Sequence, residues 1–280
     1  MTSCLMATAD ASQRGHTCWF DTIILAVANS KTSREIHKKS IFAKLQGSDL
    51  SDEILSKAGK HSSGDKLHDT ISSALGGDVC PRKPVEGHNA LKFLNGLLSL
   101  LDVGYVILST TAVSNTSEKI SEVGPCKTHI FNLEEYIKTK GLPKIRASQV
   151  ETGVCVVQVV SPISGCAKIV LTSDTIEVGL HEKYQLTLRN IIVSSKGHVI
   201  TYGTCDNPNE WFIYDNELVG KGVPPRKVSS LTFESVIDQI FHFPHAFFSL
   251  KMGTVMMNPF FLDGPQSGAT FMYDIRSIKN

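Results

Sequence analysis

Residues Gln13–Thr22 read QRGHTCWFDT, a polar, glycine-containing run that ends in a cysteine where an apolar helical pattern begins. Apolar side chains then recur at helical spacing, which predicts a helix over residues 18–29. A helix N-terminus carries about half a positive charge and favours a thiolate over a thiol. Cys18 is therefore either a small buried apolar residue or a nucleophile, and the second interpretation requires a base elsewhere in the chain.

The composition predicts a globular protein of a reducing compartment. The chain has 280 residues, 41% of them hydrophobic, which is enough for one large domain. A formal net charge of +1 and the short apolar runs favour neither nucleic acid nor a membrane as a partner. The first twelve residues lack the pattern of a secretory signal. No two of the seven cysteines form a C-x-x-C pair. We therefore expect mostly free, buried thiols, no bound metal, and a location in the cytoplasm or nucleus.

The order of the predicted elements indicates an α+β fold. Helical spacing continues in residues 66–75 and 89–101. After Asp102 the chain becomes rich in β-branched and aromatic residues, which predicts strands over residues 104–109, 154–160, 167–172, 184–194, 198–202 and 211–214. A later helix is expected over residues 232–241.

Among the ten histidines, His198 is placed best to act as the base for Cys18. It opens a predicted strand, and Asp215 directly follows the next one. In an antiparallel hairpin such ends meet, with cross-strand Cβ atoms about 5 Å apart. We expect the Asp215 carboxylate to hold the imidazole through Nδ1, so that Nε2 faces the thiol. Asn216 is an alternative orienting group, because thiol enzymes also accept an amide in that role.

An oxyanion formed by attack of Cys18 needs hydrogen-bond donors. The backbone N–H of Cys18 is one candidate, and the side-chain amide of Gln13, a few residues upstream, is the other. Trp19 and Phe20 are expected to pack in the core at the start of the helix.

These residues resemble two sequence boxes of the ubiquitin-specific proteases. The run Gln13-x-Gly15-x-Thr17-Cys18, followed by an aromatic residue, is similar to the cysteine box, which usually reads Asn-x-Gly-x-Thr-Cys-Tyr. The run Gly197-His198-x-x-x-Tyr202, with Trp211-x-x-Tyr214-Asp215-Asn216 after it, resembles the histidine box. Neither C-x-x-C pair of the family's zinc-binding fingers is present. Trp19 and Asp21 resemble instead a compact, zinc-free SUMO isopeptidase, and trimmed viral relatives have a similar length.

The resemblance implies a papain-like cysteine protease fold, with a helical N-terminal lobe and a C-terminal antiparallel β-sheet lobe. It places one catalytic domain over residues 1–252, with the helical lobe at about 12–102 and the β-rich lobe at about 103–252. Residues 253–280 extend past the family's usual end, and we expect them to pack on the domain as a C-terminal extension.

The function implied by the resemblance is removal of ubiquitin or a ubiquitin-like modifier such as SUMO from its conjugates. Cys18 would be the nucleophile, His198 the base, Asp215 its orienting partner and Gln13 an oxyanion donor. Such a thiol isopeptidase needs no cofactor, and we expect a monomer. Two alternatives stay open. One is a papain-like viral protease that cuts polypeptides, and the other is an inactive scaffold that binds a modifier, since Val199 stands where the family usually has tyrosine.

Overall fold

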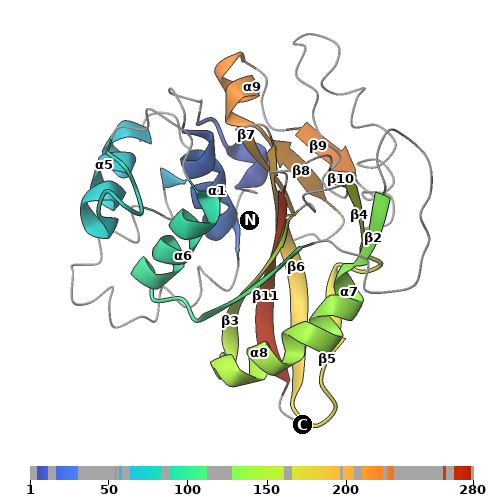
Figure 1. Ribbon diagram of the computed structural model, residues 1–280. Coiled ribbons are helices and arrows are strands. Elements are labelled where there is room, and N and C mark those ends of the chain that lie inside the picture. Colours follow the sequence, from blue (N-terminus) through green and yellow to red (C-terminus); the bar gives the residue numbers. More distant parts are fainter. Residues whose placement is uncertain are drawn as a thin grey trace.

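The computed structural model describes the chain in separate segments: residues 5–11, 17–30, 54, 57–58, 64–82, 89–111, 128–160, 166–195, 198–204, 210–222, 226–229, 261–262 and 268–278. Before Tyr105 the described elements are all helices, and after it strands predominate. Together they form an α+β arrangement in which helices lie against a long, mostly antiparallel sheet (Figure 1). The predicted fold class is confirmed in this respect.

Three helices form the N-terminal half of the described structure: α1 (Cys18–Asn29), α5 (Gly64–Leu75) and α6 (Ala90–Leu100). They match the predicted helices to within two residues, whereas the helix predicted over residues 232–241 lies outside the described residues. Helix α1 is buried at every position. Helix α6 begins where the Asn89 side chain accepts hydrogen bonds from the N–H groups of Leu91 and Lys92. Within the described segments, no helix has both the length and the apolar character needed to cross a bilayer.

The main sheet has the strand order β1-β3-β11-β6-β7-β8-β9, and β5 pairs with β6 beside this path. These strands are β1 (Tyr105–Thr111), β3 (Thr152–Val160), β5 (Thr175–Val178), β6 (Lys183–Ser195), β7 (His198–Thr204), β8 (Trp211–Tyr214), β9 (Arg226–Ser229) and β11 (Gly268–Ile278). Only the pairing of β1 with β3 is parallel among these described strands. All six predicted strands form with their bounds shifted by at most two residues, and five of them lie in this sheet.

Strand β11 shows how the described part of residues 253–280, the segment expected to pack on the domain, lies in the structure. Residues 268–278 lie in the middle of the sheet, where Phe271 is opposite Val157 of β3 on one side and Ile191 of β6 on the other. The physical reason is that β11 is apolar on both faces: Phe271 and Tyr273 point into one core, and Met272 points into the other. A strand apolar on both faces is stable only where both faces are covered.

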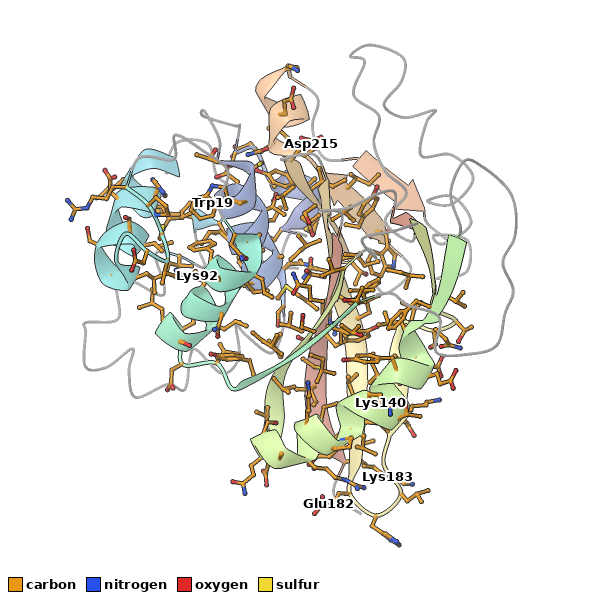
Figure 2. The ribbon with its side chains drawn as sticks, in the orientation of Figure 1. Trp19, Lys92, Lys140, Glu182, Lys183 and Asp215 are labelled. Atoms are coloured by element: carbon orange, nitrogen blue, oxygen red, sulfur yellow. The ribbon has the colours of Figure 1, made fainter. Side chains whose placement is uncertain are left out.

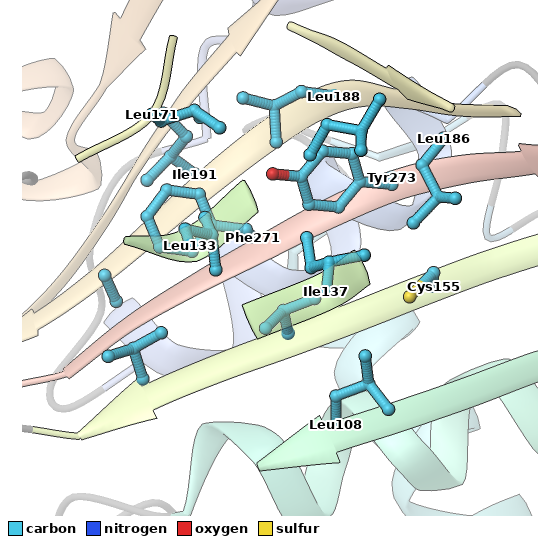
Figure 3. Packing of buried hydrophobic residues seen from close by; sticks show 14 of the residues in the cluster. Leu108, Leu133, Ile137, Cys155, Leu171, Leu186, Leu188, Ile191, Phe271 and Tyr273 are labelled. Carbon is cyan, nitrogen blue, oxygen red and sulfur yellow. The ribbon is translucent and has the colours of Figure 1, made fainter. Parts of the chain in front are cut away.

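The two faces of the sheet are covered by different helices, and the strands alternate accordingly. Val154 and Val156 of β3 pack with α1 and α6, whereas Cys155 and Val157 pack on the opposite side. On that opposite side Leu133, Ile137 and Ile145 contribute from the helices that follow residue 132 in the chain. Figure 3 shows this second core, with Leu108, Leu186, Phe271 and Tyr273 gathered over the strands.

The helical run on the second face is continuous through α7 (Leu133–Tyr136), the π-helical turn η3 (Ile137–Gly141) and α8 (Leu142–Ser148). Gly141 and Pro143 obscure its helical pattern in the sequence. The structure accommodates them because Gly141 ends the π turn and Pro143 falls in the first turn of α8, where its missing N–H is not needed. A small sheet of order β10-β4-β2 adjoins this run, with β10 (Phe261–Leu262), β4 (Cys166–Val170) and β2 (Thr128–Asn132).

Helix α1 is anchored to the sheet at its C-terminal end by buried polar contacts. The Asn29 amide donates to Asn190 Oδ1 at 3.2 Å and to the Thr204 carbonyl at 2.8 Å, and the Asn190 amide donates to the Ala26 carbonyl at 2.9 Å. The Ser30 hydroxyl donates to Asp274 Oδ1 of β11 at 2.6 Å. These bonds fix the helix against β6, β7 and β11 and so determine where its N-terminal residue, Cys18, lies.

Candidate active site

Cys18 is the first residue of α1 and is 3% exposed. The neighbouring Trp19 and Phe20 are core residues as predicted, and Trp19 packs edge-on against Phe93 of α6 with ring centroids 5.0 Å apart. These large aromatic rings hold the first turn of the helix in place. The thiol therefore has a defined position at the positive end of a helix, where a negative charge is favoured.

His198 and Asp215 come together at one end of the β7–β8 hairpin. His198 is the first residue of β7, and Asp215 is the residue after β8. Because Thr201 is opposite Tyr214 in the antiparallel pairing, the next residue, Asp215, is carried toward the start of β7. His198 Nε2 and Asp215 Oδ1 are 3.0 Å apart. The hairpin argument made from the sequence therefore describes the observed approach of these two side chains.

The structure corrects the predicted roles of the two ring nitrogens. Asp215 is bound through Nε2, not Nδ1. The His198 side chain also forms a hydrogen bond with Cys18. Since Nε2 is held by the carboxylate, Nδ1 is the nitrogen left for the sulfur. The local sequence carries no information on this point, because either nitrogen can face a carboxylate, depending on how the ring is turned about its Cβ.

The charges around His198 favour the imidazolium. Burial lowers the pKa of His198, but the hydrogen bonds to Asp215 and Cys18, together with the charges of both partners, outweigh it and raise this pKa from the ordinary 6.5 to about 10. The His198 side chain is 21% exposed and that of Asp215 is 5% exposed. The ring thus contacts a buried carboxylate and keeps partial exposure to solvent.

Asp215 is held by more than His198. Its Oδ1 also accepts a hydrogen bond from the backbone N–H of Glu217 at 3.0 Å, in the first turn of α9 (Asn216–Gly220). The buried rings of Tyr202 and Tyr214 lie nearby, and burial together with the charge of Asp215 raises the pKa of each, so both hydroxyls stay neutral. Figure 2 shows Asp215 at the base of α9, at the same end of the molecule as the start of β7.

Asn216, the alternative orienting group, does not hold the imidazole. Its amide nitrogen donates to Asp21 Oδ2 at 2.7 Å, and its buried Oδ1 has no hydrogen-bond partner among the described residues. Gln13, the predicted oxyanion donor, lies outside the described residues. In the segments that the structure describes, no group of three or more His, Cys, Asp or Glu side chains has the arrangement of a metal site.

Two contacts of the site were not foreseen from the sequence. Asp21 contacts Asn216, the residue after Asp215, and the Thr22 hydroxyl donates to the carbonyl of Val199, the residue after His198, at 3.1 Å. Both depend on how α1 is rotated over the sheet, which no local pattern specifies. The one available signal was the polar pair Asp21-Thr22 within the otherwise apolar run of residues 18–28.

No protein-family model matches the sequence, and no curated protein matches it. Solved structures do match in fold. One is a chain of the SAGA Ubp8/Sgf11/Sus1/Sgf73 DUB module, with a TM-score of 0.54 and 9% identity, covering 100% of this chain and 70% of that chain. Another comes from the same module bound to ubiquitin aldehyde, with a TM-score of 0.50 and 10% identity, covering 100% of this chain and 72% of that chain. These matches show that the chain has the papain-like protease fold predicted for it.

Proposed function

We propose that this protein is a thiol isopeptidase that removes ubiquitin or a ubiquitin-like modifier such as SUMO from its conjugates. The observation that carries the proposal is the meeting of Cys18, His198 and Asp215, which come from a helix start, a strand start and a strand end. The fold also supports the proposal, because one of the chains that matches it comes from a DUB module whose structure is bound to ubiquitin aldehyde. The modifier and its conjugates are accordingly the proposed partners.

In the proposed resting state, His198 is an imidazolium facing a Cys18 thiolate. The sulfur attacks the carbonyl carbon of the modifier's C-terminal residue, and the carbonyl oxygen becomes an oxyanion. The backbone N–H of Cys18 lies in the first turn of α1, where N–H groups lack carbonyl partners within the helix, and we propose it as one donor to this oxygen, with the side-chain amide of Gln13 as the second. The imidazolium then gives its proton to the departing lysine amine as the C–N bond breaks, leaving a thioester on Cys18.

In hydrolysis of the thioester, His198 acts first as a base instead of as an acid. His198, now neutral, takes a proton from water, and the resulting hydroxide attacks the thioester carbon. Cys18 leaves as a thiolate and the modifier's carboxylate is released, which restores the initial ion pair. Asp215 keeps the ring aligned through both steps and stabilises its charged form. Water is the only co-reactant, so the proposed reaction requires no cofactor.

Two other described thiols, those of Cys80 and Cys155, are poorly suited to act as the nucleophile. Burial raises the pKa of Cys80 to about 12, against a smaller opposing effect of Ser72, and burial raises the pKa of Cys155 to about 12. Both therefore stay protonated and unreactive at neutral pH. None of the three described thiols forms a disulfide. This supports a location in the cytoplasm or nucleus, which we propose together with a monomeric state.

The test is hydrolysis of fluorogenic C-terminal amides of ubiquitin and of SUMO by the full chain. We expect turnover of at least one, its loss in Cys18→Ala and in His198→Ala, and its retention in Cys80→Ala. Loss of turnover only in Cys80→Ala, or full activity in Cys18→Ala, would refute the assignment. Cleavage of unrelated peptides but of neither modifier would favour a general papain-like protease, and binding of a modifier without cleavage would favour a scaffold.

A further inference from the structure

Two adjacent residues of α1 reach the two strands that carry the partners of Cys18. Thr22 donates its hydroxyl hydrogen to the Val199 carbonyl at 3.1 Å, and Asp21 accepts a hydrogen bond from the Asn216 amide at 2.7 Å. Val199 directly follows His198, and Asn216 directly follows Asp215. The helix that carries the sulfur is thus connected to the chain at the residue next to each of its two partners.

The Asp21 carboxylate is built into this position. It is 8% exposed, and its Oδ2 accepts two hydrogen bonds, one from the Asn216 amide and one from the Thr17 hydroxyl at 3.0 Å. Hydrogen bonds to an ionised group are stronger than neutral ones, and a negative charge in the first turn of a helix is further stabilised by the helix dipole. A carboxylate is therefore retained here despite the cost of its burial.

Asn216 is the other half of the contact and is fully buried. Asp215 and Asn216 are consecutive, but their side chains serve different partners, since Asp215 faces His198 and Asn216 faces α1. They form the corner between β8 and α9. Because the corner has little freedom once Asn216 is fixed, the Asp21 contact determines how far the Asp215 carboxylate reaches toward the ring.

We propose that Asp21 is a positioning residue, which acts through Asn216 to hold the Asp215 carboxylate against His198 and so aligns the ring with Cys18. The proposal rests on the isopeptidase function proposed above. In this proposal the Asp21 carboxylate acts indirectly and takes no part in making or breaking bonds. It acts by fixing the distance between an α-helix and a strand end that are 195 residues apart in sequence.

The polarity of the contact makes it testable. Position 21 accepts and position 216 donates. Asn216→Asp places two carboxylates face to face in a buried site, which is unfavourable for both. Adding Asp21→Asn to Asn216→Asp restores one donor and one acceptor with the direction reversed, and the second N–H of the new amide can donate to the Thr17 hydroxyl oxygen, which can accept as well as donate. If the contact contributed only packing, exchanging the two side chains would not restore activity.

The experiment measures kcat and KM for the preferred modifier amide, thermal stability, and the pKa of His198 by NMR. In Asn216→Ala, which changes no charge, we expect kcat to fall about tenfold or more with KM nearly unchanged, because misplacement of a catalytic group slows chemistry rather than binding. The pKa of His198 should fall toward its ordinary value. Asn216→Asp should lose at least as much activity, and the double variant Asp21→Asn/Asn216→Asp should recover much of it.

Two results would overturn the proposal: an unchanged kcat and an unchanged His198 pKa in a folded Asn216→Ala protein, or a double variant no better than Asn216→Asp. If Asn216→Asp fails to fold, Asn216→Ala and the double variant still decide the matter. Failure of the isopeptidase function is distinguishable, because the wild-type protein would then be inactive while NMR would still report whether Asn216 controls the His198 pKa.

Discussion

His198 and Asp215 are 17 residues apart in sequence and 3.0 Å apart in space, joined through Nε2 of the ring and Oδ1 of the carboxylate. The same oxygen accepts the N–H of Glu217, so the carboxylate is fixed from two sides. This arrangement leaves the opposite nitrogen of the ring for Cys18 and explains why the imidazole favours its charged form.

Removal of the Asp215 carboxylate should lower the pKa of His198. Asp215 stabilises the imidazolium by a hydrogen bond and by its charge, so in Asp215→Ala the pKa falls from about 10 toward 6.5. The alkaline limb of the kcat/KM profile reports loss of the imidazolium, so it moves to lower pH by as many pH units as the pKa falls. A pH–rate profile and an NMR titration of His198 check this. An alkaline limb that stays in place would show that Asp215 does not set the charge of the ring.

The same pKa predicts how stability depends on pH. The pKa of His198 is raised on folding, so its contribution to stability is fully present below about pH 6.5 and is lost as the pH rises toward 10. We expect the free energy of unfolding to fall between these values more steeply in wild type than in His198→Gln. Chemical denaturation at several pH values measures it. Parallel curves for the two proteins would contradict the assignment.

Loss of the Thr22 hydroxyl should slow turnover without unfolding the protein. Thr22→Val keeps the shape of the side chain and removes the hydrogen bond to Val199, at a cost to stability of about 1 kcal/mol. Because the bond lies beside His198, we expect kcat to fall severalfold with KM little changed. Thr201→Val is the matched control, since the partners of its hydroxyl among the described residues are the Ile191 and Tyr202 carbonyls, both within the sheet. Equal kinetic effects in the two variants would argue against a role in alignment.

Close packing between β7 and the N-terminal segment makes Gly203 intolerant of a side chain. A Cβ there would lie 2.5 Å from Asn190 Oδ1 and 2.8 Å from the sulfur of Met6, and Asn190 is the residue that anchors α1. Gly203→Ala should lower the free energy of unfolding by about 1–3 kcal/mol. Gly77→Ala is the control, because a Cβ at Gly77 would meet nothing within 4 Å. Equal stability of the two variants would contradict the observed packing.

The central position of β11 predicts a large effect of a substitution near the C-terminus. Phe271 is fully buried between β3 and β6, so Phe271→Ala should cost about 3–5 kcal/mol of the free energy of unfolding. Leu180, which is 83% exposed in the turn between β5 and β6, supplies the control: Leu180→Ala should change little. A small effect at Phe271 would mean that residues 268–278 are an addition to the fold and not part of its core.

Much of the local structure could be predicted from the sequence because helical and strand periodicities survive in the tertiary context. The approach of His198 and Asp215 followed from hairpin geometry, which depends only on two neighbouring strands. The orientation of the imidazole ring could not be predicted from the hairpin, because it depends on contacts from α1 and on the position of the Asp215 carboxylate.

Contacts between residues far apart in the sequence were harder to predict, because they too depend on how separate elements pack together. The contacts of Asp21 and Thr22 depend on the rotation of α1 over the sheet, which buried bonds at Asn29 and Ser30 determine from the other end of the helix. The place of β11 in the sheet depends on which strands have open edges. Its alternation of buried side chains was present in the sequence, but a strand's neighbours are not encoded in its own pattern.

The most direct test of the central claim is the mass of the full chain after incubation with ubiquitin or SUMO whose C-terminus carries an electrophile, followed by mapping of the modified residue. The account predicts one added modifier on Cys18 for at least one of the two probes, and no adduct in Cys18→Ala or His198→Ala. An adduct on a different cysteine, or undiminished labelling of Cys18 in His198→Ala, would contradict it.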